Sequence, residues 1–108
     1  MTGAMARRKG ANYQRLIRHW FETHGWTVMV RPPGEDGDDI TIIEHPHLSI
    51  EVKNHARTDL PAWTAQAARQ AAGRIPVVIH KRHGTTNPEH QWVTMTLADF
   101  TRLIGEQR

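Results

Sequence analysis

Hydrophobic residues near the start of the chain recur at the spacing of one helix face. The apolar side chains of Leu16, Ile17, Trp20 and Phe21 follow Tyr13 at intervals of three, four, seven and eight residues. The asparagine at position 12 suits an N-cap, and the glycine at position 25 suits a C-terminal stop. This pattern predicts a helix over residues 12–24.

The following segments carry the β-branched and aromatic residues that are typical of strands. We predict strands over residues 26–30, 40–43 and 48–53, and Pro32 closes the first of them. The sequence His45-Pro46-His47 is a turn between the second and third strands. These two strands are therefore expected to pair as an antiparallel hairpin.

The second half of the chain continues with both helices and strands. Pro61 suits the first turn of a helix that runs to Ala72, and the apolar run 75–79 is typical of a buried strand. After a loop, a strand over 91–96 and a helix over 98–104 follow. The predicted order is α-β-β-β-α-β and then β-α, which indicates an α/β domain with a mixed central sheet flanked by helices.

The first ten residues do not share this patterning. Gly3 and Gly10 flank small residues, and the basic triplet Arg7-Arg8-Lys9 has no apolar partner. Residues 1–10 are therefore predicted to be a flexible basic arm, and residues 11–108 to be a single domain.

Composition narrows the class of protein. A chain of 108 residues is long enough for one core, and the absence of Cys excludes disulfides, thiolate nucleophiles and cysteine-based zinc sites. No apolar run approaches the roughly 20 residues that cross a bilayer, and the first residues lack the apolar stretch of a signal peptide. We expect a cytoplasmic protein without membrane contact.

Charge is unevenly distributed along the chain. The formal net charge is +3, from 14 Lys and Arg against 11 Asp and Glu, and five of the acids fall within residues 34–44. Eleven of the basic residues are Arg, whose planar guanidinium suits bidentate contact with phosphates. The balance favours a nucleic-acid partner, and the candidates for phosphate contact are Arg7, Arg8, Lys9, Arg31, Arg57, Lys81 and Arg82.

Three charged side chains are expected to meet at one end of the predicted hairpin. Residues two apart in a strand share a face, so Glu51 and Lys53 point together, and the turn places Asp39 opposite one or the other. Directly opposed Cβ atoms lie ~4.5–5.5 Å apart. Two carboxylates at this separation repel each other unless a proton or cation lies between them, and such ligands select Mg²⁺ or Mn²⁺. With Lys53 suited to orient a water or stabilise a charged phosphate, this outlines a phosphodiesterase site.

Several motifs in a fixed order give the chain a resemblance to a known family. They occur between residues 8 and 79 and read Arg8-Lys9-Gly10, Gly25-Trp26, Val30-Arg31, Ile50-Glu51-Val52-Lys53 and Gly73-Arg74-Ile75-Pro76. In this order they resemble the archaeal-type Holliday junction resolvases of the PD-(D/E)XK nuclease superfamily. The resemblance implies a restriction-endonuclease-like αβββαβ core and a metal-dependent endonuclease that cuts four-way DNA junctions. Because such a junction has two-fold symmetry, a homodimer is expected.

The resemblance also implies roles for individual residues. It makes Asp39, Glu51 and the Val52 carbonyl the metal ligands and Lys53 the catalytic lysine. It also favours Gln66, on the second predicted helix, as a polar residue near the metal. One position departs from the family pattern, because position 14 is Gln14 where such resolvases usually carry glutamate. A neutral amide can still ligate a metal but cannot act as a base.

Two alternatives remain open. The first is a nuclease of the same fold that acts on another branched or nicked DNA. The second, suggested by Gln14, is a DNA-binding module without catalytic activity. The resemblance further implies a bacterial, archaeal or phage-encoded protein.

Overall fold

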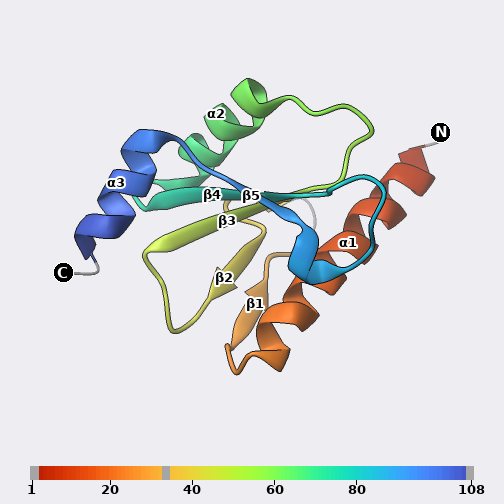
Figure 1. Ribbon diagram of the computed structural model, residues 1–108, viewed down its shortest axis with the longest axis horizontal. Coiled ribbons are helices and arrows are strands. Elements are labelled where there is room, and N and C mark those ends of the chain that lie inside the picture. The colour runs from red at the N-terminus through yellow and green to blue at the C-terminus, as the bar shows by residue number, and fades with distance from the viewer. Residues whose placement is uncertain (1–2, 33–34, 107–108) are drawn as a thin grey trace.

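The computed structural model describes residues 3–32 and 35–106. Within them the chain forms an α/β fold with a five-stranded mixed sheet and three α-helices (Figure 1). The α-helices are α1 (Gly3–Thr23), α2 (Leu60–Ala71) and α3 (Leu97–Glu106), and a short 3₁₀ helix is η1 (Pro88–His90). The strands are β1 (Val28–Val30), β2 (Ile40–Ile42), β3 (Leu48–Lys53), β4 (Ile75–His80) and β5 (Trp92–Thr94). The predicted α/β class and order of elements are confirmed.

The sheet keeps its strands in chain order, β1-β2-β3-β4-β5. Neighbouring strands are antiparallel, except that β3 and β4 are parallel and are connected through α2. Parallel neighbours need a long crossover, and a helix that packs back on the sheet supplies it. The predicted β2–β3 hairpin is confirmed by the antiparallel pairing of Ile40 with Ile50.

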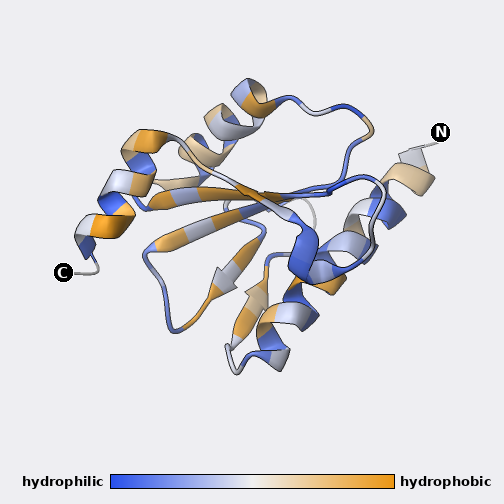
Figure 2. Ribbon diagram, in the orientation of Figure 1, coloured by the Kyte–Doolittle hydropathy of each residue, from blue (hydrophilic) through white to orange (hydrophobic). Residues whose placement is uncertain are grey.

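Alternating side chains of β4 divide the core between the two faces of the sheet. Val77 and Ile79 pack in a cluster with Tyr13 of α1, whereas Val78 packs against Trp63 of α2. Because successive strand residues point to opposite faces, α1 and α2 cover opposite sides of the sheet. Figure 2 shows the corresponding hydrophobic strands and polar connecting loops. No helix among the described residues has the length and hydropathy of a membrane span.

The N-terminal segment differs from the prediction. Residues 3–10 form the first turns of α1 instead of a flexible arm, and Asn12 lies inside that helix instead of at its N-cap. Met1 and Thr2 fall outside the described residues. Ala, Met, Arg and Lys dominate this stretch and all favour helix. Met5 also lines a groove on the same side of α1 as the later apolar residues, so the helix face begins earlier than predicted.

Other boundaries shift by a few residues. β1 begins two residues later than predicted, β2 ends before Ile43, and β4 extends to His80. β5 is three residues long instead of the six predicted, because it pairs with β4 only opposite Val78, Ile79 and His80. The length of an edge strand thus depends on its partner, which local sequence does not specify.

Candidate functional site

The β2–β3 hairpin brings two carboxylates together. The Asp39 amide donates to the Ile50 carbonyl at 2.9 Å, which continues the pairing of Ile40 with Ile50. Of the two predicted registers, this is the one that places Asp39 opposite Glu51. The Val52 amide then donates to Oδ2 of Asp39 at 2.8 Å and fixes that carboxylate at the edge of β3.

Glu51 is buried beside Asp39. Its residue surface is 2% exposed, and its Oε1 atom has no hydrogen-bond partner among the described residues. Burial, followed by the charge of Asp39 and a hydrogen bond with it, raises the pKa of Glu51 to about 8, although Lys53 acts in the opposite direction. At neutral pH the pair therefore retains a proton unless a cation balances its charge.

Lys53 projects toward α2 from the end of β3. Its Nζ donates to Oε1 of Gln66 at 2.6 Å, so the ammonium is held at a defined position. Gln66, the residue favoured near the metal, thus contacts the lysine directly. A polar side chain at that position of α2 fixes the direction of the lysine without neutralising it.

These side chains line one cavity of about 350 Å³. Asp39, Glu51 and Lys53 contribute from the hairpin, together with Val52, Gln66 of α2 and residues of α1. The α1 residues at this wall include Ala6 and Gly10, and a Cβ atom added at Gly10 would meet no atom within 4 Å. Small side chains on α1 therefore leave the space in front of the carboxylates open.

Gln14 approaches the hairpin from α1. Its Nε2 donates to the backbone carbonyl of Asp39 at 3.1 Å, and Gln14 is not among the residues that line the cavity. The structure thus places Gln14 beside Asp39, where it holds the main chain of that residue instead of facing the carboxylates.

The residue before Asp39 belongs to a separate charged cluster. Asp38 is buried, with Arg31 Nη2 at 3.0 Å and Arg74 Nη2 at 3.3 Å from its Oδ1, and the Thr41 hydroxyl donates to Oδ2 at 2.9 Å. Burial would raise the pKa of Asp38, but the hydrogen bonds from Arg74, Arg31 and Thr41 hold it below its usual value. This acid is compensated within the fold and joins the loop before β2 to the residue before β4.

Some of the residues predicted to contact phosphates lie near the cavity. Lys9 lines it together with Asp39 and Glu51, and Arg8 lines a groove that adjoins it. Arg7 is exposed on the first turns of α1, and Arg57 is exposed on the segment between β3 and α2. The N-terminal part of α1 therefore brings positive charge to the mouth of the cavity.

The other three predicted cations are engaged within the fold. Arg31 belongs to the Asp38 cluster, and Nζ of Lys81 donates to the carbonyls of Arg82 and Thr85. The Arg82 guanidinium lies 4.6 Å from the centroid of the Trp92 ring. None of these three residues is among those that line the cavity.

Sequence analysis missed the two polar residues Asn54 and His55 of the cavity wall, which directly follow Lys53. The His55 ring lies 5.7 Å from the ring of Trp63. Burial, followed by the positive charges of Lys53 and Lys9, lowers the pKa of His55. The signal that could have indicated Asn54 and His55 was their position directly after Lys53, because a chain that leaves β3 at this end must pass beside the cavity.

The candidate metal ligands are two carboxylates and one backbone carbonyl. No group of three or more His, Cys, Asp or Glu side chains suited to a metal occurs in residues 3–32 and 35–106. An ion held by Asp39, Glu51 and the Val52 carbonyl would therefore complete its coordination with other oxygens. That arrangement is usual for Mg²⁺, which keeps several waters and binds one or two carboxylates.

Comparisons with known proteins do not assign a family. A scan against protein-family models finds no matching model, and a search of the curated proteins finds no match. The chemistry of the cavity is therefore the basis on which a function is inferred.

Proposed function

We propose that the protein is a Mg²⁺- or Mn²⁺-dependent DNA endonuclease that hydrolyses phosphodiester bonds. The observation that carries this proposal is the cavity in which two adjacent carboxylates, Asp39 and Glu51, meet the ammonium of Lys53. The α-β-β-β-α-β order supports a restriction-endonuclease-like core, because that core would present such a hairpin at the end of its sheet. The resolvase-like motifs lie on these same elements.

The residues present fit a hard divalent cation. Oε1 of Glu51 is a buried oxygen without a partner in the described part of the chain, and the facing Asp39 carboxylate adds a second negative charge. These two groups and the Val52 carbonyl would hold the ion through oxygen atoms, which Mg²⁺ and Mn²⁺ prefer. When bound, such an ion supplies positive charge to a phosphate and makes a water easier to deprotonate.

The other side chains of the site position water and phosphate. Lys53, held by Gln66, is placed to donate to the attacking water or to a phosphate oxygen on which charge builds up. Lys9 adds a second cation at the mouth of the cavity and attracts the DNA backbone. Gln14 holds the Asp39 carbonyl and cannot act as a base.

Among DNA substrates, the four-way junction is the one that the resolvase-like motifs imply. Two matched cuts on a two-fold symmetric junction require two sites, so we propose a homodimer as the active form. The last strand and helix are the candidate contact, because they expose apolar side chains: Trp92, Val93, Leu97, Phe100 and Ile104.

A cleavage assay on labelled DNA tests the proposal. A four-way junction, a flap, a nicked duplex and a linear duplex of equal length are incubated with Mg²⁺, with Mn²⁺ and with EDTA. The junction is expected to be cut only with a metal, and Asp39→Ala and Lys53→Ala are each expected to slow cutting by about 10²–10³-fold. The matched controls are Asp36→Ala, which removes a negative charge as Asp39→Ala does, and Arg69→Ala, which removes a positive charge as Lys53→Ala does. Both positions are exposed, and both variants should retain activity.

The same assay distinguishes the alternatives. Cutting of the flap or nicked DNA without cutting of the junction would indicate a nuclease of the same fold with another substrate. DNA binding without cutting by the wild-type protein in either metal would indicate a DNA-binding module, as Gln14 suggests. Unchanged cutting by Asp39→Ala would contradict the proposed site.

A further inference from the structure

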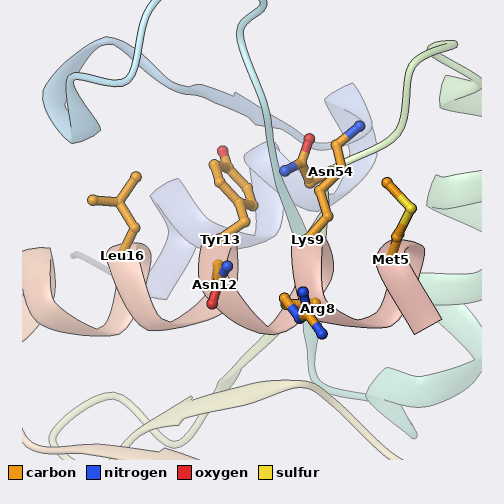
Figure 3. A pocket seen from close by; sticks show the side chains of 7 residues that line it. All are labelled: Met5, Arg8, Lys9, Asn12, Tyr13, Leu16 and Asn54. Carbon is orange, nitrogen blue, oxygen red and sulfur yellow. The ribbon is translucent and has the colours of Figure 1, made fainter. Parts of the chain in front are cut away.

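A second hollow adjoins the candidate site along α1. Figure 3 shows Met5, Lys9, Tyr13 and Leu16 extending from one side of the helix, with Asn54 near the ends of Lys9 and Tyr13. We call this hollow, which Arg8 and Asn12 also line, the α1 groove. Its volume is about 520 Å³, inside the roughly 300–1,000 Å³ range of pockets that hold a small ligand.

The α1 groove adjoins the cavity that contains Asp39 and Glu51. Lys9 and Asn54 line both hollows, so the two share a wall. Arg8 adds a second cation to the α1 groove. A DNA strand with one phosphate at the carboxylates would therefore carry a neighbouring nucleotide into the α1 groove, with cations beside its backbone.

The lining of the α1 groove combines apolar surface with one unused polar atom. Tyr13 is only 4% exposed, and its hydroxyl donates to Oε1 of Gln91 at 3.0 Å, so its ring forms a fixed wall. Oδ1 of Asn54 is buried and has no hydrogen-bond partner within residues 3–32 and 35–106. An unpaired buried acceptor destabilises the fold, and a ligand that donates a hydrogen bond to it would recover that loss.

A nucleobase has the chemistry that this lining requires. Its faces are apolar and stack on aromatic or aliphatic surface, and its edge carries hydrogen-bond donors. A base inside a duplex can enter a protein groove only by losing its pair and its stacking, whereas an unpaired base leaves the stack at a lower cost. The α1 groove therefore favours an unpaired base over a paired one.

We infer that the α1 groove binds an unpaired nucleobase next to the scissile phosphate. The inference rests on the proposed DNA endonuclease function and deepens it, because it names a feature of the DNA that a surface beside the carboxylates would recognise. It selects DNA that carries an unpaired nucleotide, as at a flap or a bulge, and a four-way junction would have to open a base pair at its branch point to fill the groove.

Binding in the absence of cleavage tests this inference. In the Lys53→Ala background with Mg²⁺, affinity is measured for a duplex with one bulged nucleotide and for a fully paired duplex with the same number of phosphates. The bulged DNA is expected to bind about tenfold more tightly, because stacking of the unpaired base adds to the free energy of binding. A 2-aminopurine at the bulge is expected to change its fluorescence on binding.

Two variants locate the effect, and one serves as a matched control. Met5→Glu places a carboxylate at a half-exposed position of the α1 groove, and Asn54→Leu removes the unpaired acceptor, so both are expected to reduce the tenfold ratio toward one. Ala11→Glu adds the same charge at an exposed position of α1 outside the groove. It is expected to weaken binding of both DNAs equally and to leave the ratio unchanged.

The possible results separate this inference from the proposed function. Equal affinity of the Lys53→Ala parent for the two DNAs, or an unchanged ratio in both groove variants, would overturn the inference while leaving the endonuclease proposal intact. Absence of binding to either DNA would contradict both. A change in sedimentation of Met5→Glu without a change in the ratio would identify the groove as a contact between copies of the chain and would also overturn the inference.

Discussion

Two consecutive acids in the loop before β2 have opposite surroundings. Asp38 is 1% exposed, and Arg31 and Arg74 form ion pairs with it that hold its pKa low. Asp39 instead faces Glu51, whose pKa burial and the neighbouring carboxylate raise to about 8. One acid thus has its counter-charge supplied by the protein, and the other shares its space with a like charge.

The difference shows that the fold compensates the charge of Asp38 and leaves the pair in the proposed site uncompensated. A buried carboxylate needs a partner, because removal from water without compensation costs several kcal/mol. The Asp38 cluster meets this need internally and links distant parts of the chain. The pair of Asp39 and Glu51 leaves it to a proton or a cation from solution, which is the property expected of a metal site. Four predictions test this comparison.

The largest expected effect is the loss of stability on substitution of Asp38. Asp38→Ala would leave the charges of Arg31 and Arg74 without their partner, and it is expected to lower the free energy of unfolding by about 3–5 kcal/mol. Urea unfolding with EDTA measures this change. Asp36→Ala, at an exposed position of the same loop, is expected to change it by less than about 0.5 kcal/mol. Similar unfolding of the two variants would remove the distinction between the acids.

Substitution of Glu51, in the proposed site, is expected to change stability in the opposite direction. The folded pKa of Glu51, about 8, lies above its ordinary 4.5, so the folded state holds more protons and loses stability as pH rises between these values. Glu51→Gln mimics the protonated acid and should increase the free energy of unfolding by about 2–4 kcal/mol at pH 8. At pH 5 the gain should be small. Urea unfolding with EDTA at both pH values checks the sign, and a larger gain at pH 5 would contradict it.

Magnesium is expected to reverse this pH dependence. Ion binding requires both carboxylates to be deprotonated and releases a proton, so Mg²⁺ should stabilise the wild-type protein more at pH 8 than at pH 6. At saturating concentration the gain is expected to be about 1–3 kcal/mol. Thermal unfolding with Mg²⁺ and with EDTA measures it. Glu51→Gln should lose this stabilisation by Mg²⁺. If the variant were stabilised as much as the wild-type protein, the ion would bind elsewhere.

The smallest expected effects are those of substituting two glutamines of α2. Gln66 accepts from Lys53 at 2.6 Å, whereas Oε1 of Gln70 accepts from the Gly37 amide at 2.6 Å. Gln66→Ala is therefore expected to slow DNA cleavage about tenfold with little loss of stability, because the lysine loses its fixed position. Gln70→Ala is expected to lower the free energy of unfolding by about 1 kcal/mol, because a half-buried amide loses its acceptor. Cleavage rates and urea unfolding are measured for both variants. Slower cleavage by Gln70→Ala and a loss of stability in Gln66→Ala would contradict this assignment.

The sequence was sufficient to predict the hairpin and the elements around it. Alternation along β3 and a short turn leave few registers, and either predicted register places Asp39 on the face of Glu51 and Lys53. The pairing of Ile40 with Ile50 then selects one of them. These features depend on local periodicity, which is present in a single sequence.

The sequence was not sufficient to predict interactions between residues that are far apart along the chain. Asp38 and Arg74 are separated by 36 positions, so their ion pair exists only after the sheet has formed. The same holds for Arg31, predicted to contact phosphates, which the fold pairs with Asp38. The start of α1 was missed for another reason, since the glycines at positions 3 and 10 obscured a run of good helix formers.

A calorimetric titration of the protein with Mn²⁺ tests most directly whether the carboxylate pair holds a divalent ion. The wild-type protein and Asp36→Ala are each expected to bind one ion per chain, and Asp39→Ala is expected to lose that binding while it remains folded. Equal binding of Mn²⁺ by Asp39→Ala and Asp36→Ala, or no binding by the wild-type protein, would contradict the assignment of Asp39 and Glu51 as metal ligands.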